Sequence, residues 1–175
     1  MAALGLVRGS SGNVSVRRGD ILLITPSGIP YERIHASQVV AIDLEGRPIS
    51  GGGAPSSEWR MHVSIYRARG DVRAIVHTHS PAGMAAAAAL PALPVPNDEG
   101  ALIFGEVIPV SRHAPPGTWD LAQAVAEVLG EKGKAALIAR HGAVAVGRTL
   151  VEALLLAEKL EEVATVFFFS RTEAR

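Results

Sequence analysis

Short strand-like runs alternate irregularly with helix-like stretches along this chain of 175 residues. Most of the strand-like runs are rich in β-branched residues, and the last two are rich in small residues; glycine, proline and serine turns separate such runs, a pattern that predicts strands. They cover residues 13–17, 20–25, 38–43, 72–78, 107–110, 135–139 and 143–146. This alternation predicts an α/β fold in which helices flank a central, mixed or mostly antiparallel sheet.

Helix start signals precede the longer stretches of helical periodicity. Ser57 and Thr118 offer hydroxyl caps, and Thr149 with Glu152 has the spacing of a capping box. We expect helices at 57–69, 81–90 and 118–129 and from 149 onward, with a flexible loop at 51–53. The sequence shows no internal repeat or linker, so we expect a single domain over residues 1–175.

Composition narrows the classes of partner. Lysine plus arginine and aspartate plus glutamate both number 17, so the net charge is zero and no basic surface is predicted for nucleic acid. Residues 74–97 are free of Asp, Glu, Lys and Arg, but their histidines and prolines exclude a membrane span. The chain lacks cysteine, and its start lacks the basic residues of a secretory signal. We therefore expect a cytoplasmic protein with neither a nucleic-acid nor a membrane partner.

Two histidines, His77 and His79, lie at the end of a predicted strand. Side chains at positions i and i+2 of a strand project to the same face, so both rings can reach one ion. His141, in a glycine-containing turn, is the best candidate for a third nitrogen ligand of a zinc site, and Glu58 could complete the shell or stand beside it. Spacing alone leaves open the alternative of two exposed strand-end histidines and one turn histidine.

The other histidines and the long apolar runs have simpler interpretations. His62 is predicted to be a core-facing or capping residue of its helix, and His35 and His113 are expected at the surface. We interpret the alanine run at 85–89 and the phenylalanine run at 167–169 as packing surfaces, the second of which could face another subunit.

Three clusters of small polar residues form a second feature, at 10–13, 25–28 and 55–57. Each offers hydroxyls and backbone N–H groups, and the third precedes a helix, where the backbone favours an anion. Together they could bind a phosphate, although each alone is an ordinary turn or helix cap. An acid such as Glu58 in a first helical turn usually stabilises the helix dipole, but its position beside this cluster makes it a candidate catalytic base.

Taken in order, five segments resemble the motif set of the class II aldolase and adducin family. They are SSGNVSVR, LLITPSGIPYE, PSSEWRMH, VHTHS and RHGAVAVG, and they span nearly the whole chain. The resemblance implies a central antiparallel sheet layered by helices, a homotetramer and active sites at subunit interfaces. It also implies cleavage of a ketose 1-phosphate, of the L-fuculose 1-phosphate type, to dihydroxyacetone phosphate and a lactaldehyde-like aldehyde.

The same resemblance assigns roles to residues. It implies that His77, His79 and His141 hold one zinc ion per subunit and that Glu58 is the acid/base beside it. The positions that match phosphate-binding residues are Asn13, Ser27, Gly28, Ser56 and Ser57. A divalent metal can stabilise the negative charge left when the carbon–carbon bond breaks, so this chemistry requires no lysine Schiff base.

The sequence departs from the family pattern in three places. Aldolases of the family use a tyrosine from the adjacent subunit as a second proton donor, whereas this chain reads Asn97-Asp98-Glu99-Gly100, so Asp98 or Glu99 is the expected substitute. The chain also begins at the first motif and ends soon after the last predicted helix, whereas family members usually extend further at both ends.

Other activities occur on the same scaffold. A methylthioribulose-1-phosphate dehydratase stays open, whereas a sugar-phosphate 4-epimerase is expected to need further carboxyl-terminal groups. A non-enzymatic, adducin-type interaction module would lack the metal site, and the presence of the three histidines with Glu58 disfavours it.

Overall fold

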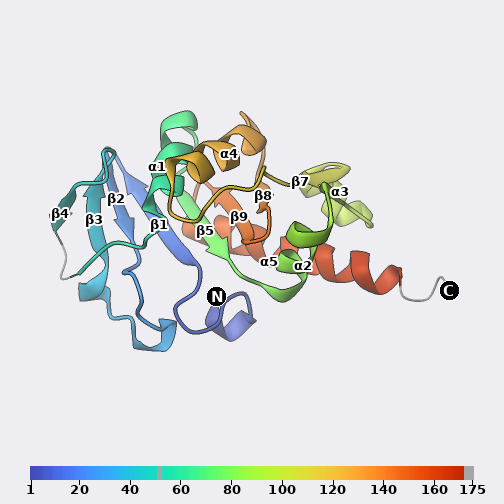
Figure 1. Cartoon of the computed structure of the whole chain (residues 1–175), viewed down its shortest axis with the longest axis horizontal. Coiled ribbons are helices and arrows are strands. Elements are labelled where there is room, and N and C mark those ends of the chain that lie inside the picture. Colours follow the sequence, from blue (N-terminus) through green and yellow to red (C-terminus); the bar gives the residue numbers. More distant parts are fainter. Residues whose placement is uncertain (51–52, 172–175) are drawn as a thin grey trace.

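A seven-stranded sheet organises the computed structural model, which describes residues 1–50 and 53–171 (Figure 1). Its strand order is β4-β3-β2-β1-β5-β9-β8, and each pair of neighbours runs antiparallel. The strands are β1 (Asn13–Arg18), β2 (Ile21–Ile24), β3 (Val40–Asp43), β4 (Pro48–Ser50), β5 (Ala74–Thr78), β8 (Ala135–Ile138) and β9 (Gly142–Gly147). A separate antiparallel pair is formed by β6 (Ala92–Pro94) and β7 (Val107–Pro109).

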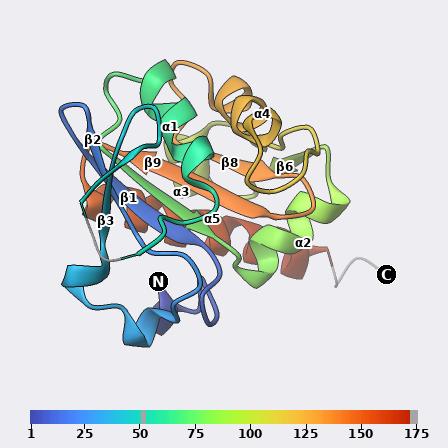
Figure 2. The ribbon, with the colours of Figure 1, turned by 60° about the vertical axis from the view of Figure 1, so that its left-hand side comes forward.

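Helices cover both faces of the sheet (Figures 1 and 2). On one face lie α1 (Trp59–Ala68) and α4 (Trp119–Leu129), which pack against each other. On the other face lie α2 (Pro81–Ala89) and the long α5 (Leu150–Ser170), and α3 (Asp98–Phe104) contacts α5 and β7. This arrangement confirms the predicted α/β fold with helices flanking a mostly antiparallel sheet.

Strand alternation divides the apolar interior into two cores. In β5, Ile75 joins the core beneath α1 and α4, whereas Ala74 and Val76 join the core beneath α2 and α5. The α5 side of β8 and β9 is rich in alanine, which lets the helix pack close to the strands, at positions 135, 143 and 145. The same alternation places His77 on the α1 side of the sheet, within reach of the start of α1.

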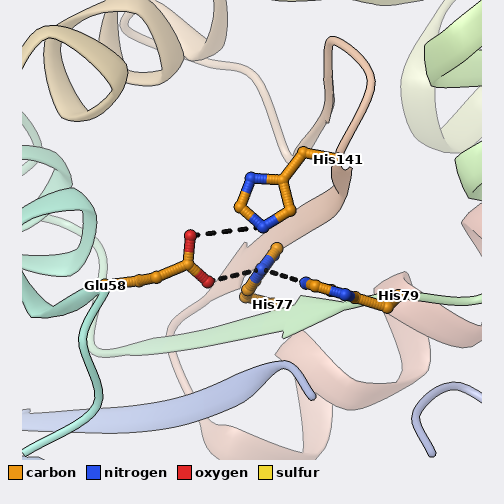
Figure 3. Close-up of side chains that lie close together, drawn as sticks. All are labelled: Glu58, His77, His79 and His141. Atoms are coloured by element: carbon orange, nitrogen blue, oxygen red, sulfur yellow. Dashed lines mark hydrogen bonds and ion pairs between the residues drawn. The ribbon is translucent and has the colours of Figure 1, made fainter. Parts of the chain in front are cut away.

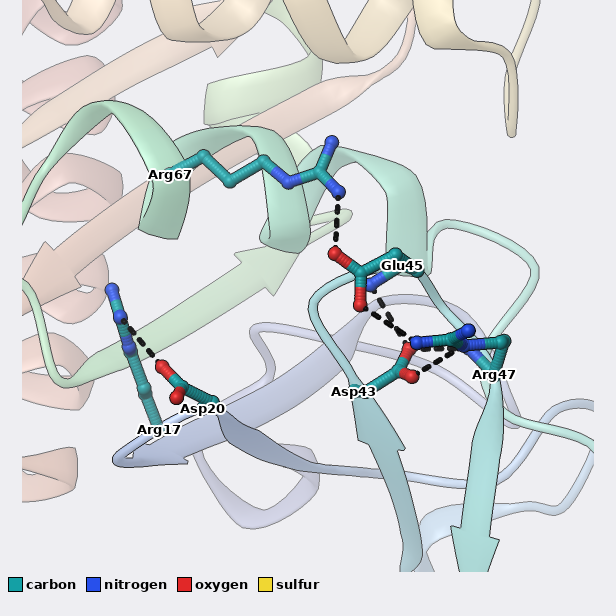
Figure 4. A network of polar contacts seen from close by, with 6 residues as sticks. All are labelled: Arg17, Asp20, Asp43, Glu45, Arg47 and Arg67. Carbon is teal, nitrogen blue, oxygen red and sulfur yellow. Dashed lines mark hydrogen bonds and ion pairs between the residues drawn. The ribbon is translucent and has the colours of Figure 1, made fainter.

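Exposed charges hold the turn between β3 and β4 (Figure 4). Asp43 accepts hydrogen bonds from the backbone N–H groups of Glu45 and Arg47 and from Nε of Arg47. From α1, Arg67 lies 3.4 Å from the Glu45 carboxylate. These contacts connect the edge hairpin of the sheet to the helix above it.

Several element boundaries differ from the prediction. The helix expected from Ser57 begins at Trp59, and no side-chain hydrogen bond caps it. The preceding segment stays extended because Pro55 forms a β-bridge with Pro26 and the N–H of Ser56 donates to the carbonyl of Thr25. The strand expected from residue 38 begins at residue 40, because residues 36–38 form a 3-10 turn.

The other helix starts are confirmed, and one helix was not predicted. The hydroxyls of Thr118 and Thr149 accept the N–H groups of Leu121 and Glu152. The additional helix is α3, whose start is capped by Asn97. Of the loop predicted at 51–53, residues 51–52 lie outside the described residues. Across the described ranges, no helix is both long enough and apolar enough to cross a bilayer.

Candidate active site

The end of β5 meets the beginnings of β1 and β9 at one end of the sheet. In the strand register, His77 of β5 lies opposite Asn13 of β1, and Thr78 lies opposite Ala143 of β9. Two glycines permit this close approach, because a Cβ at Gly12 would clash with the carbonyl of His77 and one at Gly142 with the carbonyl of Thr78. Residues from distant parts of the chain therefore converge here.

Three imidazoles and one carboxylate meet at this point (Figure 3). The rings of His77, His79 and His141 lie edge-on to one another, with centroids 4.8 to 5.0 Å apart. Their ligand atoms and that of Glu58 all lie within 4.8 Å of one another. The predicted convergence of these residues is thus observed. The alternative of two exposed strand-end histidines and one turn histidine is wrong, because His77 is fully buried and His79 is half-buried.

The hydrogen bonds of His77 show which of its ring nitrogens carries a hydrogen. Nδ1–H donates to the carbonyl oxygen of Ala143 (2.9 Å), which can only accept. In the neutral ring, Nε2 then presents a lone pair to Oε2 of Glu58 and to Nε2 of His79, each 2.9 Å away. Lone pairs that face each other at this distance need a proton or a cation between them.

Burial and the neighbouring charges shift the pKa values of the three histidines. Burial alone would lower the pKa of His77, but the Glu58 carboxylate raises it above the ordinary value. Burial, together with the neighbouring His77, lowers the pKa of His79 to about 4, and the same two causes lower the pKa of His141. Near neutral pH, two of the three rings are therefore neutral and able to act as ligands.

The donor set fits a divalent metal. His141 leaves its Nδ1 buried without a hydrogen-bond partner, and Oε1 of Glu58 is likewise buried and unbonded, although it lies 3.3 Å from Nε2 of His141. Imidazole nitrogen and carboxylate oxygen are ordinary ligands of zinc and related ions. The bond from His77 to the backbone is of the kind that orients a metal-ligating ring.

Glu58 lies at the N-cap position of α1, just before the first helical turn. Its side chain is 8% exposed, and its Oε2 also accepts a hydrogen bond from the Asn13 amide (3.2 Å). Burial would raise the pKa of Glu58, but the neighbouring imidazoles, His77 foremost, lower it to about 2. Glu58 is therefore ionised at neutral pH.

A polar cavity of about 470 Å³ opens beside the cluster. All three small polar clusters that the sequence indicated contribute to its wall, together with Glu58, His79 and His141. The second and third clusters are joined by the Ser56–Thr25 hydrogen bond and by a further one from the N–H of Ser27 to the carbonyl of Ala54. The predicted phosphate-binding residues all line this cavity: Asn13, Ser27, Gly28, Ser56 and Ser57.

Arg140 is a cavity residue that the sequence reasoning missed. It is exposed and lines the cavity next to His141. Its φ of 61° is the only positive value at a non-glycine residue in the described part of the chain. Such backbone strain is concentrated at functional sites. The signal available was its place in the RHG turn, between two predicted strands.

Other predicted residues lie apart from this cluster. Asp98 and Glu99 begin α3 and do not line the cavity, and Glu99 forms an ion pair with Lys159 of α5 (3.1 Å). Their assignment to a neighbouring subunit's site stays a prediction. His62 is fully buried, as predicted, and His35 and His113 are exposed, as predicted.

Comparison with known proteins identifies the family. The profile described as Class II Aldolase and Adducin N-terminal domain matches residues 1–168. The chain belongs to the class II aldolase and adducin family. The predicted fold and family resemblance are therefore confirmed.

Named relatives are aldolases. The L-fuculose phosphate aldolase of Escherichia coli (strain K12) is 40% identical over 95% of this chain and 77% of its own length. A 5-methylthioribulose-1-phosphate/5-deoxyribulose-1-phosphate aldolase of Rhodospirillum rubrum is 41% identical over 96% of this chain and 75% of its own. A solved L-fuculose 1-phosphate aldolase superimposes with a TM-score of 0.93 at 31% identity, covering 99% of this chain and 82% of that one. Class II aldolases use a divalent metal, and the group of Glu58, His77, His79 and His141 could hold such an ion.

Proposed function

We propose that this family member is a zinc-dependent aldolase that cleaves a ketose 1-phosphate, of the L-fuculose 1-phosphate type, to dihydroxyacetone phosphate and lactaldehyde. The observation that supports this most strongly is the convergence of His77, His79 and His141 with Glu58. This cluster borders a cavity whose other wall is rich in hydroxyls and glycine N–H groups. Hydroxyls and N–H groups of this kind can bind a phosphate. The histidines and Glu58 would then lie beside the sugar carbons that react.

Each group has a role in this proposal. Ser27, Gly28, Ser56 and Ser57 bind the phosphate and fix the substrate's position. The three histidines hold one divalent ion per subunit, which when bound supplies Lewis-acid stabilisation of the charge that develops at the ketone oxygen. We propose zinc because three imidazoles with a neighbouring carboxylate match its preferred ligands.

Glu58 moves the proton at carbon 3 of the sugar. During cleavage the hydroxyl on carbon 4 gives its proton to the carboxylate of Asp98 or Glu99 from the neighbouring subunit, the bond between carbons 3 and 4 breaks, and the aldehyde leaves. The electron pair stays on the fragment that bears the phosphate. Glu58, protonated for this step, delivers its proton to carbon 3, which completes dihydroxyacetone phosphate and returns Glu58 to the carboxylate form. In the reverse direction the Glu58 carboxylate, which is ionised at neutral pH, removes that proton.

We further propose that the active protein is a homotetramer in which Asp98 or Glu99 of one subunit acts as the second proton donor in the neighbouring site. An apolar groove of about 720 Å³ between α3 and α5 supports an interface near these residues. Exposed apolar side chains lie in or beside it: Leu102, Val151 and Leu155. Cytoplasmic location stays a prediction of the cysteine-free composition.

A second candidate substrate is 5-deoxyribulose 1-phosphate or its 5-methylthio analogue. The Rhodospirillum rubrum relative, at 41% identity, supports it as strongly as overall similarity supports L-fuculose 1-phosphate. The same proton transfers and the same bond cleavage would apply. The difference would lie at the aldehyde end of the substrate.

A substrate panel tests the proposal. Purified protein is incubated with L-fuculose 1-phosphate, 5-deoxyribulose 1-phosphate, methylthioribulose 1-phosphate and ribulose 5-phosphate, and the products are identified. We expect dihydroxyacetone phosphate plus an aldehyde, loss of activity on chelation, and recovery with zinc. Dehydration of methylthioribulose 1-phosphate, epimerisation of ribulose 5-phosphate, or full cleavage by chelated protein would contradict it.

A further inference from the structure

A buried ladder of polar side chains runs from Glu58 into the core between α1 and β1. Glu58, His62 and Tyr66 are spaced four residues apart, so they share one face of the helix. Opposite them, Asn13 and Ser15 are spaced two residues apart on one face of β1. His62 is 0% exposed, Tyr66 and Ser15 are each 1% exposed, and Asn13 is 3% exposed.

The hydrogen bonds of this ladder have a defined direction. The Glu58 carboxylate only accepts, so Asn13 must turn its NH₂ group toward Oε2 and its Oδ1 toward His62. Nε2 of His62 must then carry the proton and donate to that Oδ1. The unprotonated Nδ1 accepts from the hydroxyl of Ser15 (2.6 Å).

Tyr66 closes the ladder. Its hydroxyl lies 2.9 Å from Oγ of Ser15 and 3.1 Å from the backbone oxygen of Ser15, and both can accept its proton. Each side chain from Tyr66 to Asn13 thus has a partner, as buried polar groups require. Burial lowers the pKa of His62 to about 3, which agrees with a neutral ring that has one donor and one acceptor nitrogen.

The ladder distinguishes the two oxygens of Glu58. Oε2 receives the Asn13 amide and faces His77, whereas Oε1 has no hydrogen bond. Without the amide, rotation about the last side-chain bond of Glu58 could exchange the two oxygens. With it, Oε1 is the oxygen left to exchange a proton, and the carboxylate plane is fixed.

We infer that His62 and Asn13 are positioning residues that fix the orientation of the Glu58 carboxylate, with Ser15 holding His62 in its Nε2–H form. This inference rests on the proposed role of Glu58. A purely apolar interior at this place would have satisfied packing, since the surrounding core is built from aliphatic side chains. The polar ladder leads to a charged group, and hydrogen bonds to charged groups are the strong ones.

Asn13 keeps a second amide hydrogen in this scheme. One N–H is committed to Glu58 and Oδ1 to His62, so the remaining N–H is available to the cavity that Asn13 lines. The predicted phosphate contact of Asn13 is therefore compatible with its positioning role. His62 does not line the cavity, so a variant at that position tests positioning without removing a substrate contact.

The first test reads the ring of His62 directly. Protein labelled with ¹⁵N-histidine is studied by NMR with and without zinc, and the His62 signals are assigned with the His62→Gln variant. We expect a neutral Nε2–H tautomer in both samples at pH 7. A neutral Nδ1–H tautomer, or a protonated ring, would overturn the directed ladder whatever the protein's activity.

The second test measures proton transfer. Wild-type protein should exchange a carbon-bound hydrogen of dihydroxyacetone phosphate with deuterium in D₂O. We expect His62→Leu to lower both this exchange rate and kcat by about 10- to 100-fold, the range typical of residues that orient a site from behind. KM and bound zinc should change by less than about twofold, and His62→Gln, which retains an N–H donor, should recover much of the rate.

A matched control separates positioning from loss of stability. Ile65→Val removes one buried methylene from the same helix and should leave the exchange rate unchanged. If wild-type protein exchanges hydrogen and His62→Leu, still folded and zinc-loaded, does so equally fast, the positioning role is wrong. If wild-type protein itself fails to exchange hydrogen, the proposed function is wrong. The NMR experiment then still decides whether the hydrogen bonds of the ladder have the stated direction.

Discussion

Two polar networks contact α1, one through Arg67 and the other through Glu58 at the N-cap position, and they differ in their access to water. At the β3–β4 turn, the side chains of Arg47 and Glu45 are 74% and 55% exposed (Figure 4). At the other network, His77 is fully buried and the Glu58 side chain is 8% exposed (Figure 3). Water and salt weaken the electrostatic interactions of the first network. Those of the second network are screened much less, because its groups are buried.

The contrast shows where charge has chemical consequences. Asp43 and its partner Arg47 keep the charge states they would have in water, and their contacts chiefly shape a turn. In the buried cluster, the same types of interaction lower one imidazole pKa to about 4 while they raise another. Burial, more than the number of charges, makes the cluster around Glu58 a reactive site.

Removal of a ligand should have the largest effect. We expect His77→Ala or His141→Ala to abolish zinc binding and cleavage, since the cluster loses a nitrogen donor. Glu58→Gln should retain zinc and lower kcat by about 10²- to 10⁴-fold, because the amide cannot exchange the proton. Metal analysis and steady-state kinetics measure both effects. Normal cleavage by Glu58→Gln would refute its role as the proton-transfer group.

A side chain at Gly142, where β9 approaches β5 closely, should have the second-largest effect. In Gly142→Ala, the new methyl group would meet the carbonyl of Thr78 and lie 3.2 Å from the His79 ring. We expect a loss of about 1–3 kcal/mol in the free energy of unfolding and weaker zinc binding. Urea denaturation and zinc titration provide the measurements. Gly53→Ala, at an exposed glycine with open space around its Cβ position, serves as the control.

The burial of His62 should make stability depend on pH. In the unfolded chain the ring takes up a proton near its ordinary pKa of 6.5, whereas in the folded protein its pKa is about 3. As the pH falls from 6.5 toward 3, the unfolded state therefore binds more protons and stability decreases, by up to about 1.4 kcal/mol per pH unit. Above pH 6.5 the ring is neutral in both states and contributes no pH dependence.

Metal-free wild-type protein and His62→Gln can be compared by urea unfolding at several pH values from 7.5 to 4.5. Other groups titrate in both proteins, so the difference between the two curves isolates His62. We expect the wild type to lose stability more steeply below pH 6.5. Parallel curves would show that His62 is protonated in the folded protein.

The exposed network should tolerate change best. Arg47→Ala removes the side-chain partner of Asp43, but the two backbone N–H groups that Asp43 accepts are retained. We expect little change in the free energy of unfolding, less still at high salt, and no change in zinc content or kcat. Thermal unfolding at low and high salt checks this. A strong loss of cleavage activity would contradict the conclusion that only the buried network affects the chemistry.

Periodicity predicted the parts of the molecule that are fixed by local patterns. The spacing of His77 and His79 correctly placed both rings at one strand end, and the threonines at 118 and 149 correctly marked two helix starts. His141 could be named as a partner because a glycine-containing turn follows a strand there. Each of these signals is contained within a few residues of the chain.

Some features that depend on contacts between distant segments were missed. The start of α1 was placed two residues early, because the pairing of residue 55 with residue 26 is invisible to a local pattern. The Asn13–Glu58 hydrogen bond joins residues 45 positions apart. The burial of His62 was predicted, but its hydrogen bonds to Asn13 and Ser15 were not. The four-residue spacing from Glu58 through His62 to Tyr66, set beside Asn13-x-Ser15, was the available signal.

The location of Glu58 just before the first turn of α1 links reactivity to the packing of a whole helix. From that point α1 continues into the interior through Met61, Val63 and Tyr66, all almost completely buried. A substitution that tilts or slides the helix would move the carboxylate with it, because only a few bonds separate the two. Variants far from the cavity could therefore change turnover without touching substrate, and screens for stabilising core replacements in this protein should record rate alongside melting temperature.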